Sequence, residues 1–162
     1  MGRASSAASI RFATRADALG IAEMSRDLIE HGLGWSWTPL RVRKSIADAS
    51  TNVALAVRGG MPVGFGIMKY RDDEAHLLLL AVSPAFLRQR IGADLVGWLE
   101  ASARVAGIGQ VYLEARSANS VGRMFYRRLG YAEIQTVPRY YSGVEASIRM
   151  AKDLWREQPA SA

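Results

Sequence analysis

Residues 76–100 read HLLLLAVSPAFLRQRIGADLVGWLE, and this stretch decides the fold. Its first part, residues 77–82, is apolar enough for a strand that is covered on both faces. Ser83 and Pro84 end that run, and Ile91, Leu95 and Leu99 then recur at helical spacing. The change of period predicts a buried strand, a short loop and a helix in direct succession.

The start of that helix is a natural seat for an anion. The N–H groups of a first helical turn have no partners inside the helix, and the helix dipole adds partial positive charge there. Gly92 leaves the main chain open to a phosphate, while Arg88 and Arg90 bring positive charge to the same loop. The pattern favours a cofactor with a pyrophosphate; an ordinary strand-loop-helix connection is the alternative.

Residues 111–131, VYLEARSANSVGRMFYRRLGY, supply another strand and another helix. Together the two stretches resemble the GCN5-related N-acetyltransferase (GNAT) superfamily. The resemblance implies an α/β (α+β) fold, with a mixed central sheet of about six to seven strands, helices on both faces and a splayed cleft between the fourth and fifth strands. It also implies acetyl-CoA as the cofactor.

The family's pyrophosphate signature is written R/Q-x-x-G-x-G/A. Leu87 occupies the R/Q position here, Arg90 the first glycine and Gly92 the second, so two of the three positions depart from the pattern. A main-chain donor mechanism remains available. The resemblance implies these cofactor-binding residues: Leu80, Ala81, Val82, Arg88, Gln89, Arg90, Ile91, Gly92, Ala93, Asn119 and Tyr126.

The resemblance also assigns the chemistry. Tyr126 stands where the family places its general acid, and a phenol with a pKa of about 10 is protonated at neutral pH. Glu114, in the tetrapeptide LEAR, resembles the base of ribosomal-protein-alanine N-acetyltransferases, acting through water. His76 is a second candidate base, and the N–H of Val82 is the expected oxyanion donor. Asn119 is expected to bind the pantetheine arm, to cap a helix, or both.

Two segments are candidates for the acceptor site. Residues 139–151, RYYSGVEASIRMA, resemble the Tyr-Tyr loop and closing strand of N-terminal acetyltransferases, which implies that Tyr140 and Tyr141 shape the acceptor groove. Residues 32–39, GLGWSWTP, place Trp35 and Trp37 in an unusual loop. That loop is either a hydrophobic plug over the core or a wall of the acceptor pocket.

Composition limits the other possibilities. A chain of 162 residues with 49% hydrophobic content fills one core, so we expect a single domain over residues 10–155 between flexible tails at 1–9 and 156–162. The absence of cysteine excludes disulfides and thiolate metal sites. No metal is expected. The cytoplasm is the expected location, since a chain without cysteine suits a reducing compartment. A net charge of +6 favours polyanions such as coenzyme A, and without a nucleic-acid-binding motif we predict neither nucleic acid nor membrane as a partner. Either a monomer or a homodimer is compatible.

Hydrophobic periodicity and turn residues predict the other elements. Strands are expected at residues 10–14, 52–57, 63–70, 111–115, 131–135 and 146–150, with helices at 15–31, 39–49 and 121–129. Gly59 and Gly60 predict a hairpin turn, Thr38 a helix cap, and residues 72–74 a solvated turn.

The predicted function is an acetyl-CoA-dependent N-acetyltransferase that acts on a primary amine, most simply the α-amine of a peptide or protein. Deprotonating an α-amine of pKa near 8 costs about 1 kcal/mol at pH 7, against about 4.6 kcal/mol for a lysine, which suits a base that works through water. A small-molecule amine acetyltransferase is one alternative. A catalytically silent acyl-CoA-binding regulator is the other, because the signature departs at Leu87 and Arg90.

Overall fold

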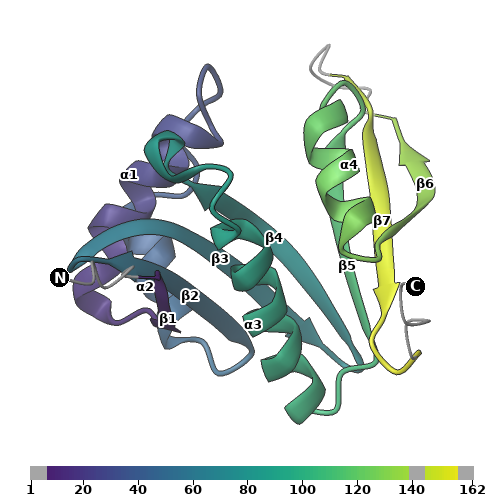
Figure 1. Ribbon diagram of the computed structural model, residues 1–162, viewed down its shortest axis with the longest axis horizontal. Helices are drawn as coiled ribbons and strands as arrows, with labels where there is room; N and C mark the ends of the chain where they lie inside the picture. Colours follow the sequence, from purple (N-terminus) through teal and green to yellow (C-terminus); the bar gives the residue numbers. More distant parts are fainter. Residues whose placement is uncertain (1–6, 139–144, 157–162) are drawn as a thin grey trace, which may run out of the picture.

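The structure is a computed structural model of the chain, and it describes residues 7–138 and 145–156. Within these residues seven strands form one mixed sheet in the order β1-β2-β3-β4-β5-β7-β6 (Figure 1). The strands are β1 (Ser9–Phe12), β2 (Thr51–Arg58), β3 (Met61–Arg71), β4 (Glu74–Val82), β5 (Gln110–Arg116), β6 (Ala132–Val137) and β7 (Ser147–Asp153). The helices are α1 (Ala18–Leu28), α2 (Pro39–Ala47), α3 (Ile91–Val105) and α4 (Ser120–Arg128).

Helices cover both faces of the sheet, as the sequence predicts. On one face α1 and α2 contribute Ile21 and Val42 to a core cluster with Phe65 of β3. On the other face Leu95 and Leu99 of α3 belong to a second cluster, against which α4 also packs. Among the described residues, no helix combines the length and apolar character needed to cross a membrane.

Glycines between β2 and β3 and on β3 itself allow a tight turn and close helix packing. Gly59 and Gly60 have positive φ values of 58° and 76°, which the two-residue turn between β2 and β3 requires. A Cβ atom on Gly66 would lie 2.8 Å from Cδ1 of Leu99, and one on Gly64 would lie 2.9 Å from the carbonyl oxygen of Ala81. The two β3 glycines therefore let α3 lie directly against the strand.

β4 and β5 are parallel neighbours that pair over only a short distance. Their ladder runs from Glu74 opposite Gln110 to His76 opposite Tyr112. Beyond these residues the strands diverge, and Figure 1 shows β4 leading toward α3 while β5 leads toward α4. In β4, a shift of register against β3 near Leu78 marks a bulge close to the point of divergence. The expected splay is confirmed.

Several element boundaries differ from the sequence prediction by a few residues, and two of the differences have a clear structural cause. β4 begins at Glu74, because the ladder with β3 continues to the pair Arg71–Glu74, so Glu74 is a strand residue rather than part of the turn. α1 ends at Leu28 rather than at residue 31. The N–H groups of Ile29 and Glu30 both donate to the carbonyl of Ser25, which closes the last turn and redirects the chain.

Candidate active site

The loop between β4 and α3 has the backbone conformation that glycine usually supplies. Arg88 and Arg90 have positive φ values of 64° and 65°, and Arg90 directly precedes α3. Arg90 stands at the first glycine of the pyrophosphate signature, so the left-handed turn persists although the residue type has changed. Since this conformation costs an L-residue about 1–2 kcal/mol, the surrounding structure must hold the loop in its shape.

The first turn of α3 presents main-chain donors beside this loop. The N–H of Asp94 donates to the carbonyl of Arg90 at 2.9 Å and makes the first helical hydrogen bond. The N–H groups of Ile91, Gly92 and Ala93 precede that bond, and the positive end of the helix dipole lies at the same place. This set of donors fits a pyrophosphate.

Gly92 brings no side chain next to these donors. A Cβ atom at this position would lie 3.3 Å from Cζ of Phe125 on α4 and 3.7 Å from Cγ2 of Val82 on β4. Glycine therefore lets the first turn of α3 lie close to α4 and to the end of β4. The absence of a side chain at Gly92 and the main-chain donors together fit the phosphate-bearing arm of coenzyme A.

The remaining loop and strand residues differ in what they can offer a ligand. Gln89 accepts a hydrogen bond from Arg58 of β2, so its side chain is engaged at the end of the sheet. Leu87 is exposed at the position where the signature has arginine or glutamine. The side chains of Leu80 and Ala81 pack into the two core clusters, so these residues can contact a ligand only through the main chain.

The main chain of Val82 points into the gap between the strands. The N–H of Ser83 donates to the carbonyl of Val63 at 2.8 Å, across to β3. Successive N–H groups of a strand point to opposite edges, so the N–H of Val82 is directed toward the β5 side, where the ladder has already ended. This direction suits a donor to a carbonyl oxygen held in the gap.

Tyr126 lies on α4, on the same side of the sheet as α3. Its ring makes edge contacts with Phe125 at 5.0 Å and with Tyr131 at 5.9 Å between centroids. Burial raises the pKa of Tyr126 to about 12, so the phenol stays protonated across the neutral range. A protonated, apolar-packed phenol is suited to donate a proton to a leaving thiolate.

Asn119 caps α4. Its Oδ1 accepts a hydrogen bond from the N–H of Gly122 at 2.9 Å, and the residue is exposed. The capping role that the sequence allows is therefore present, and the cap fixes the start of the helix that carries Tyr126. Contact with the pantetheine arm stays a prediction.

Glu114 lies on the opposite face of the sheet from Tyr126. Val111 and Leu113 of β5 are buried toward α3, so the alternation of the strand turns Tyr112 and Glu114 to the other side. Oε1 of Glu114 accepts a hydrogen bond from Arg149 of β7 at 2.8 Å, and the half-buried pair sits directly across the β5–β7 ladder. Arg149 also lies over the ring of Tyr112, 5.0 Å from its centroid.

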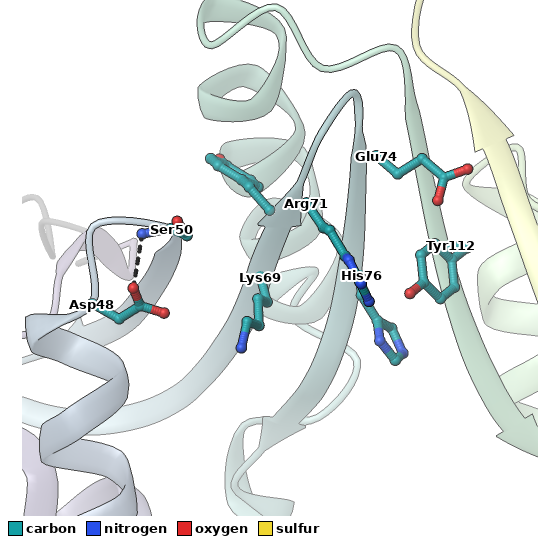
Figure 2. Close-up of a pocket in the computed structure, with 8 residues that line it drawn as sticks. Asp48, Ser50, Lys69, Arg71, Glu74, His76 and Tyr112 are labelled. Carbon is teal, nitrogen blue, oxygen red and sulfur yellow. Dashed lines mark hydrogen bonds between the residues drawn. The ribbon is translucent and has the colours of Figure 1, made fainter.

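A solvent-open pocket of about 490 Å³ lies at the closed end of the β4–β5 divergence. Figure 2 shows His76 and Tyr112 beside each other in its lining, and their rings stack with centroids 4.3 Å apart. Burial lowers the pKa of His76. The charge of Glu114 raises this pKa by a smaller amount, and the charge of Arg149 lowers it further. Neutral at pH 7, His76 remains able to accept a proton.

The loop between α1 and α2 is organised by a buried carboxylate. Oε1 of Glu30 accepts hydrogen bonds from the N–H and hydroxyl of Ser36 at 2.7 and 2.6 Å and from the N–H of Trp37 at 3.1 Å. Trp37 itself is buried in the core, which fits the plug interpretation for this residue. Trp35 is 38% exposed, and its Nε1 donates a hydrogen bond to the carbonyl of Ala22. Trp35 is therefore the tryptophan of this loop that an acceptor could contact.

The structure groups most of the predicted site residues around the diverging strands. Tyr140 and Tyr141 lie outside the described residues. Two residues that shape the site escaped the sequence analysis, Glu30 and Arg149. For Arg149 a signal existed, since an arginine stands between Ile148 and Met150, which are both apolar. Its pairing with Glu114 depends on the register of β5 against β7, which the sequence alone does not define.

A helix N-terminus that can bind phosphates, beside two parallel strands that diverge and a partly buried phenol, defines a transferase of the acyl-CoA-dependent class. The Acetyltransferase (GNAT) family model matches residues 22–131. The chain belongs to the GNAT family, is an N-acetyltransferase and uses acetyl-CoA as its cosubstrate.

Individual relatives agree with this assignment. N-alpha-acetyltransferase RimI of Mycobacterium tuberculosis is 32% identical over 140 residues, which cover 82% of this chain and 85% of that protein. The [ribosomal protein bS18]-alanine N-acetyltransferase of Escherichia coli K12 is 30% identical over 118 residues, or 71% and 79% of the two chains. The PaiA N-acetyltransferase of Thermoplasma acidophilum, solved in complex with coenzyme A, shares the fold with a TM-score of 0.78 over 91% of this chain and 99% of that one, at 21% identity.

Proposed function

We propose that this protein transfers the acetyl group of acetyl-CoA to the N-terminal α-amine of a peptide or protein in the cytoplasm. One observation carries the proposal: the protonated phenol of Tyr126 and the carboxylate of Glu114 lie on opposite faces of the sheet at the diverging strands. This arrangement suits a cosubstrate on the α3–α4 side and an amine that approaches from the other side. The names of the relatives that are 30–32% identical favour an α-amine.

The proposed chemistry divides among three groups of this chain. Bound acetyl-CoA would supply the thioester, held by the main chain of residues 91–93. The carboxylate of Glu114, held in place by Arg149, takes a proton from the substrate ammonium, directly or through a water molecule, so that the neutral amine can attack the thioester carbonyl. The N–H of Val82 donates to the carbonyl oxygen as negative charge develops on it, and the phenol of Tyr126 protonates the leaving thiolate.

The low cost of deprotonating an α-amine supports this acceptor. At pH 7 an α-amine of pKa near 8 needs about 1 kcal/mol to lose its proton, whereas a lysine amine needs about 4.6 kcal/mol. Glu114 is held in an ion pair with Arg149, and a carboxylate is a weak base that takes the proton of an ammonium of pKa near 8 more easily than that of a lysine. The acceptor with the lower pKa therefore fits this base better.

A substrate screen tests the proposal. Release of free thiol from acetyl-CoA is measured with a library of peptides whose N-termini vary, with the same peptides blocked at the α-amine, and with small amines. We expect turnover with free α-amines and none with the blocked peptides, even where these contain lysine. Turnover confined to small amines would support the small-molecule enzyme, and coenzyme A binding without any turnover would support the silent regulator.

A further inference from the structure

A buried charged cluster lies beneath the site and takes no part in the chemistry described so far. The carboxylate of Glu100 accepts a hydrogen bond from the hydroxyl of Tyr131 at 2.8 Å and from Nζ of Lys152 at 3.0 Å. Only 6% of the Glu100 side chain and 12% of the Lys152 side chain are exposed, and Tyr131 is 2% exposed. We call these three residues the Glu100 cluster.

The Glu100 cluster joins the two halves of the splayed sheet. Glu100 belongs to α3, the helix whose first turn forms the phosphate seat, whereas Lys152 belongs to β7 and Tyr131 follows α4. The ladder between β4 and β5 ends at His76 and Tyr112, so the cluster adds a directional contact between the halves away from that ladder. It therefore relates the position of α3 to that of the C-terminal strands.

Tyr131 connects the cluster to Tyr126. Its N–H donates to the carbonyl oxygen of Tyr126 at 3.0 Å, and its ring forms the edge contact with the Tyr126 ring at 5.9 Å. Burial and the neighbouring Glu100 carboxylate raise the pKa of Tyr131, so its hydroxyl keeps its proton and remains a donor. Tyr131, whose hydroxyl is bound by Glu100, thus contacts Tyr126 through both its main chain and its ring.

Stability alone gives a weak reason for such a cluster. Three polar groups in a core can often be replaced by apolar side chains of similar volume without loss of stability, because desolvation offsets most of the attraction between buried charges. A polar cluster adds a defined geometry, because hydrogen bonds of fixed length and angle hold the three side chains in one arrangement. A defined geometry matters most next to a group that must be placed accurately against a leaving atom.

We infer that the Glu100 cluster sets the position of the Tyr126 phenol relative to the first turn of α3, with Glu100, Tyr131 and Lys152 as positioning residues. The inference rests on the proposed role of Tyr126 as the proton donor. It predicts that removing one hydroxyl from Tyr131 disturbs the chemical step while the seat for the cofactor is unchanged.

The test is a double-mutant cycle with Tyr131→Phe and Tyr126→Phe. Tyr131→Phe keeps the ring and leaves Glu100 paired with Lys152, so the fold is retained. We expect kcat to fall about tenfold, with the acetyl-CoA dissociation constant within twofold of the original value. In the Tyr126→Phe background the same change should leave kcat unaffected, because the group being positioned is already absent.

Two further variants separate positioning from stability. The double change Glu100→Leu with Lys152→Met removes the charges together with the acceptor of the Tyr131 hydroxyl and should reproduce the loss of kcat. Ala103→Gly, one turn further along α3, should lower the melting temperature without lowering kcat, because the buried Ala103 makes none of the side-chain hydrogen bonds of the cluster.

The outcomes are distinct. A Tyr131→Phe enzyme with full kcat overturns the inference, and so does a tenfold loss that persists in the Tyr126→Phe background. If Tyr126→Phe alone retains full activity, the proposed proton donor is wrong, and a loss in Tyr131→Phe then has to act by another route. An equal loss of kcat in Ala103→Gly would mean that the loss in Tyr131→Phe reflects lower stability, and it would also overturn the inference.

Discussion

Tyr126 is the residue whose surroundings bear most directly on the chemistry. Its ring is packed between Phe125 and Tyr131, and burial raises its pKa to about 12. We expect Tyr126→Phe to lower kcat at least tenfold and up to the roughly 10²- to 10⁴-fold that general acids contribute, because the ring stays and only the proton donor is lost. Thiol release gives kcat, and a titration with acetyl-CoA should show an unchanged dissociation constant. Full activity would remove Tyr126 from the mechanism.

Glu114 allows a second test at the level of one residue. Glu114→Gln keeps the shape of the side chain and its place beside Arg149 but removes the proton acceptor. We expect kcat/KM for a peptide at pH 7 to fall by about 10²-fold and the rise of rate with pH to flatten. The measurement is a pH-rate profile of both proteins with one peptide. Identical profiles would mean that another group, with His76 the nearest candidate, or bulk water takes the proton.

Substitutions at Arg90 and Gly92, in the same turn, should have opposite effects. Arg90 has a φ of 65°, so Arg90→Gly should raise the free energy of unfolding by up to about 1 kcal/mol, the relief of strain being partly offset by the freedom of glycine in the unfolded chain. Loss of its exposed charge should weaken acetyl-CoA binding by no more than about fivefold. Urea denaturation and calorimetric titration measure the two effects.

Gly92→Glu is the contrasting variant for this turn. It places bulk and negative charge in the space bounded by Phe125 and Val82, so we expect acetyl-CoA binding to disappear while the fold is retained. Retained affinity in this variant would show that the phosphate seat lies elsewhere. A less stable Arg90→Gly protein would show that the Arg90 side chain contributes contacts that outweigh its backbone strain.

At the scale of elements, the α1–α2 loop depends on Glu30. Removing the charge with Glu30→Gln weakens the bonds to Ser36 and Trp37, so the free energy of unfolding should fall by about 2 kcal/mol. KM for the acceptor should rise while the acetyl-CoA dissociation constant stays the same. The loop connects α1 and α2, whereas the phosphate seat is formed by the first turn of α3. Glu23→Gln, an exposed change on α1, is the matched control and should shift stability by less than about 0.5 kcal/mol. Equal effects of the two variants would contradict an organising role for Glu30.

Elements whose signals are local could be predicted from the sequence. The change of period before Ile91, the glycines of the β2–β3 turn and the Thr38 cap with Pro39 after it each act within a few residues, and each is found where expected. The end of α1 could not be predicted, because it depends on Glu30 finding partners beyond the helix. The same is true of the start of β4, which is fixed by pairing with β3.

The candidate site shows the same division between local and long-range signals. Tyr126, Glu114 and Gly92 could be singled out because a motif surrounds each of them. Glu100 had a subtler signal, a charged residue on the apolar stripe of α3 that requires a buried partner, yet nothing near it in the sequence names Lys152, which the fold brings in from β7.

At the scale of the whole molecule, three titrating groups have pKa values that are lower in the folded state than in the unfolded chain. Hydrogen bonding to Arg11, ahead of smaller effects, lowers the pKa of Asp17 to about 2. Burial alone would raise the pKa of Glu30, but the hydrogen bonds from its loop outweigh it and hold the pKa below its ordinary value. Burial lowers the pKa of His76.

The sign of the pH dependence follows from these three shifts. A group whose pKa is lower in the folded state binds fewer protons there than in the unfolded chain, so acid favours unfolding. For His76 the loss of stability begins as the pH falls through about 6.5, and for Asp17 and Glu30 it begins near pH 4 and continues toward pH 2 for Asp17. Stability should therefore decline in two stages as the pH is lowered from 7.

Urea denaturation between pH 7 and pH 3 measures both stages. His76→Gln cannot be protonated in either state, so its free energy of unfolding should stay level between pH 7 and 5 while that of the unchanged protein declines. Asp17→Asn should be less stable at pH 7 and should lose less on further acidification, because its bonds to Arg11 no longer depend on a charge that acid removes. Parallel declines in all three proteins would mean that other groups govern acid unfolding and that neither side chain has the surroundings described for it.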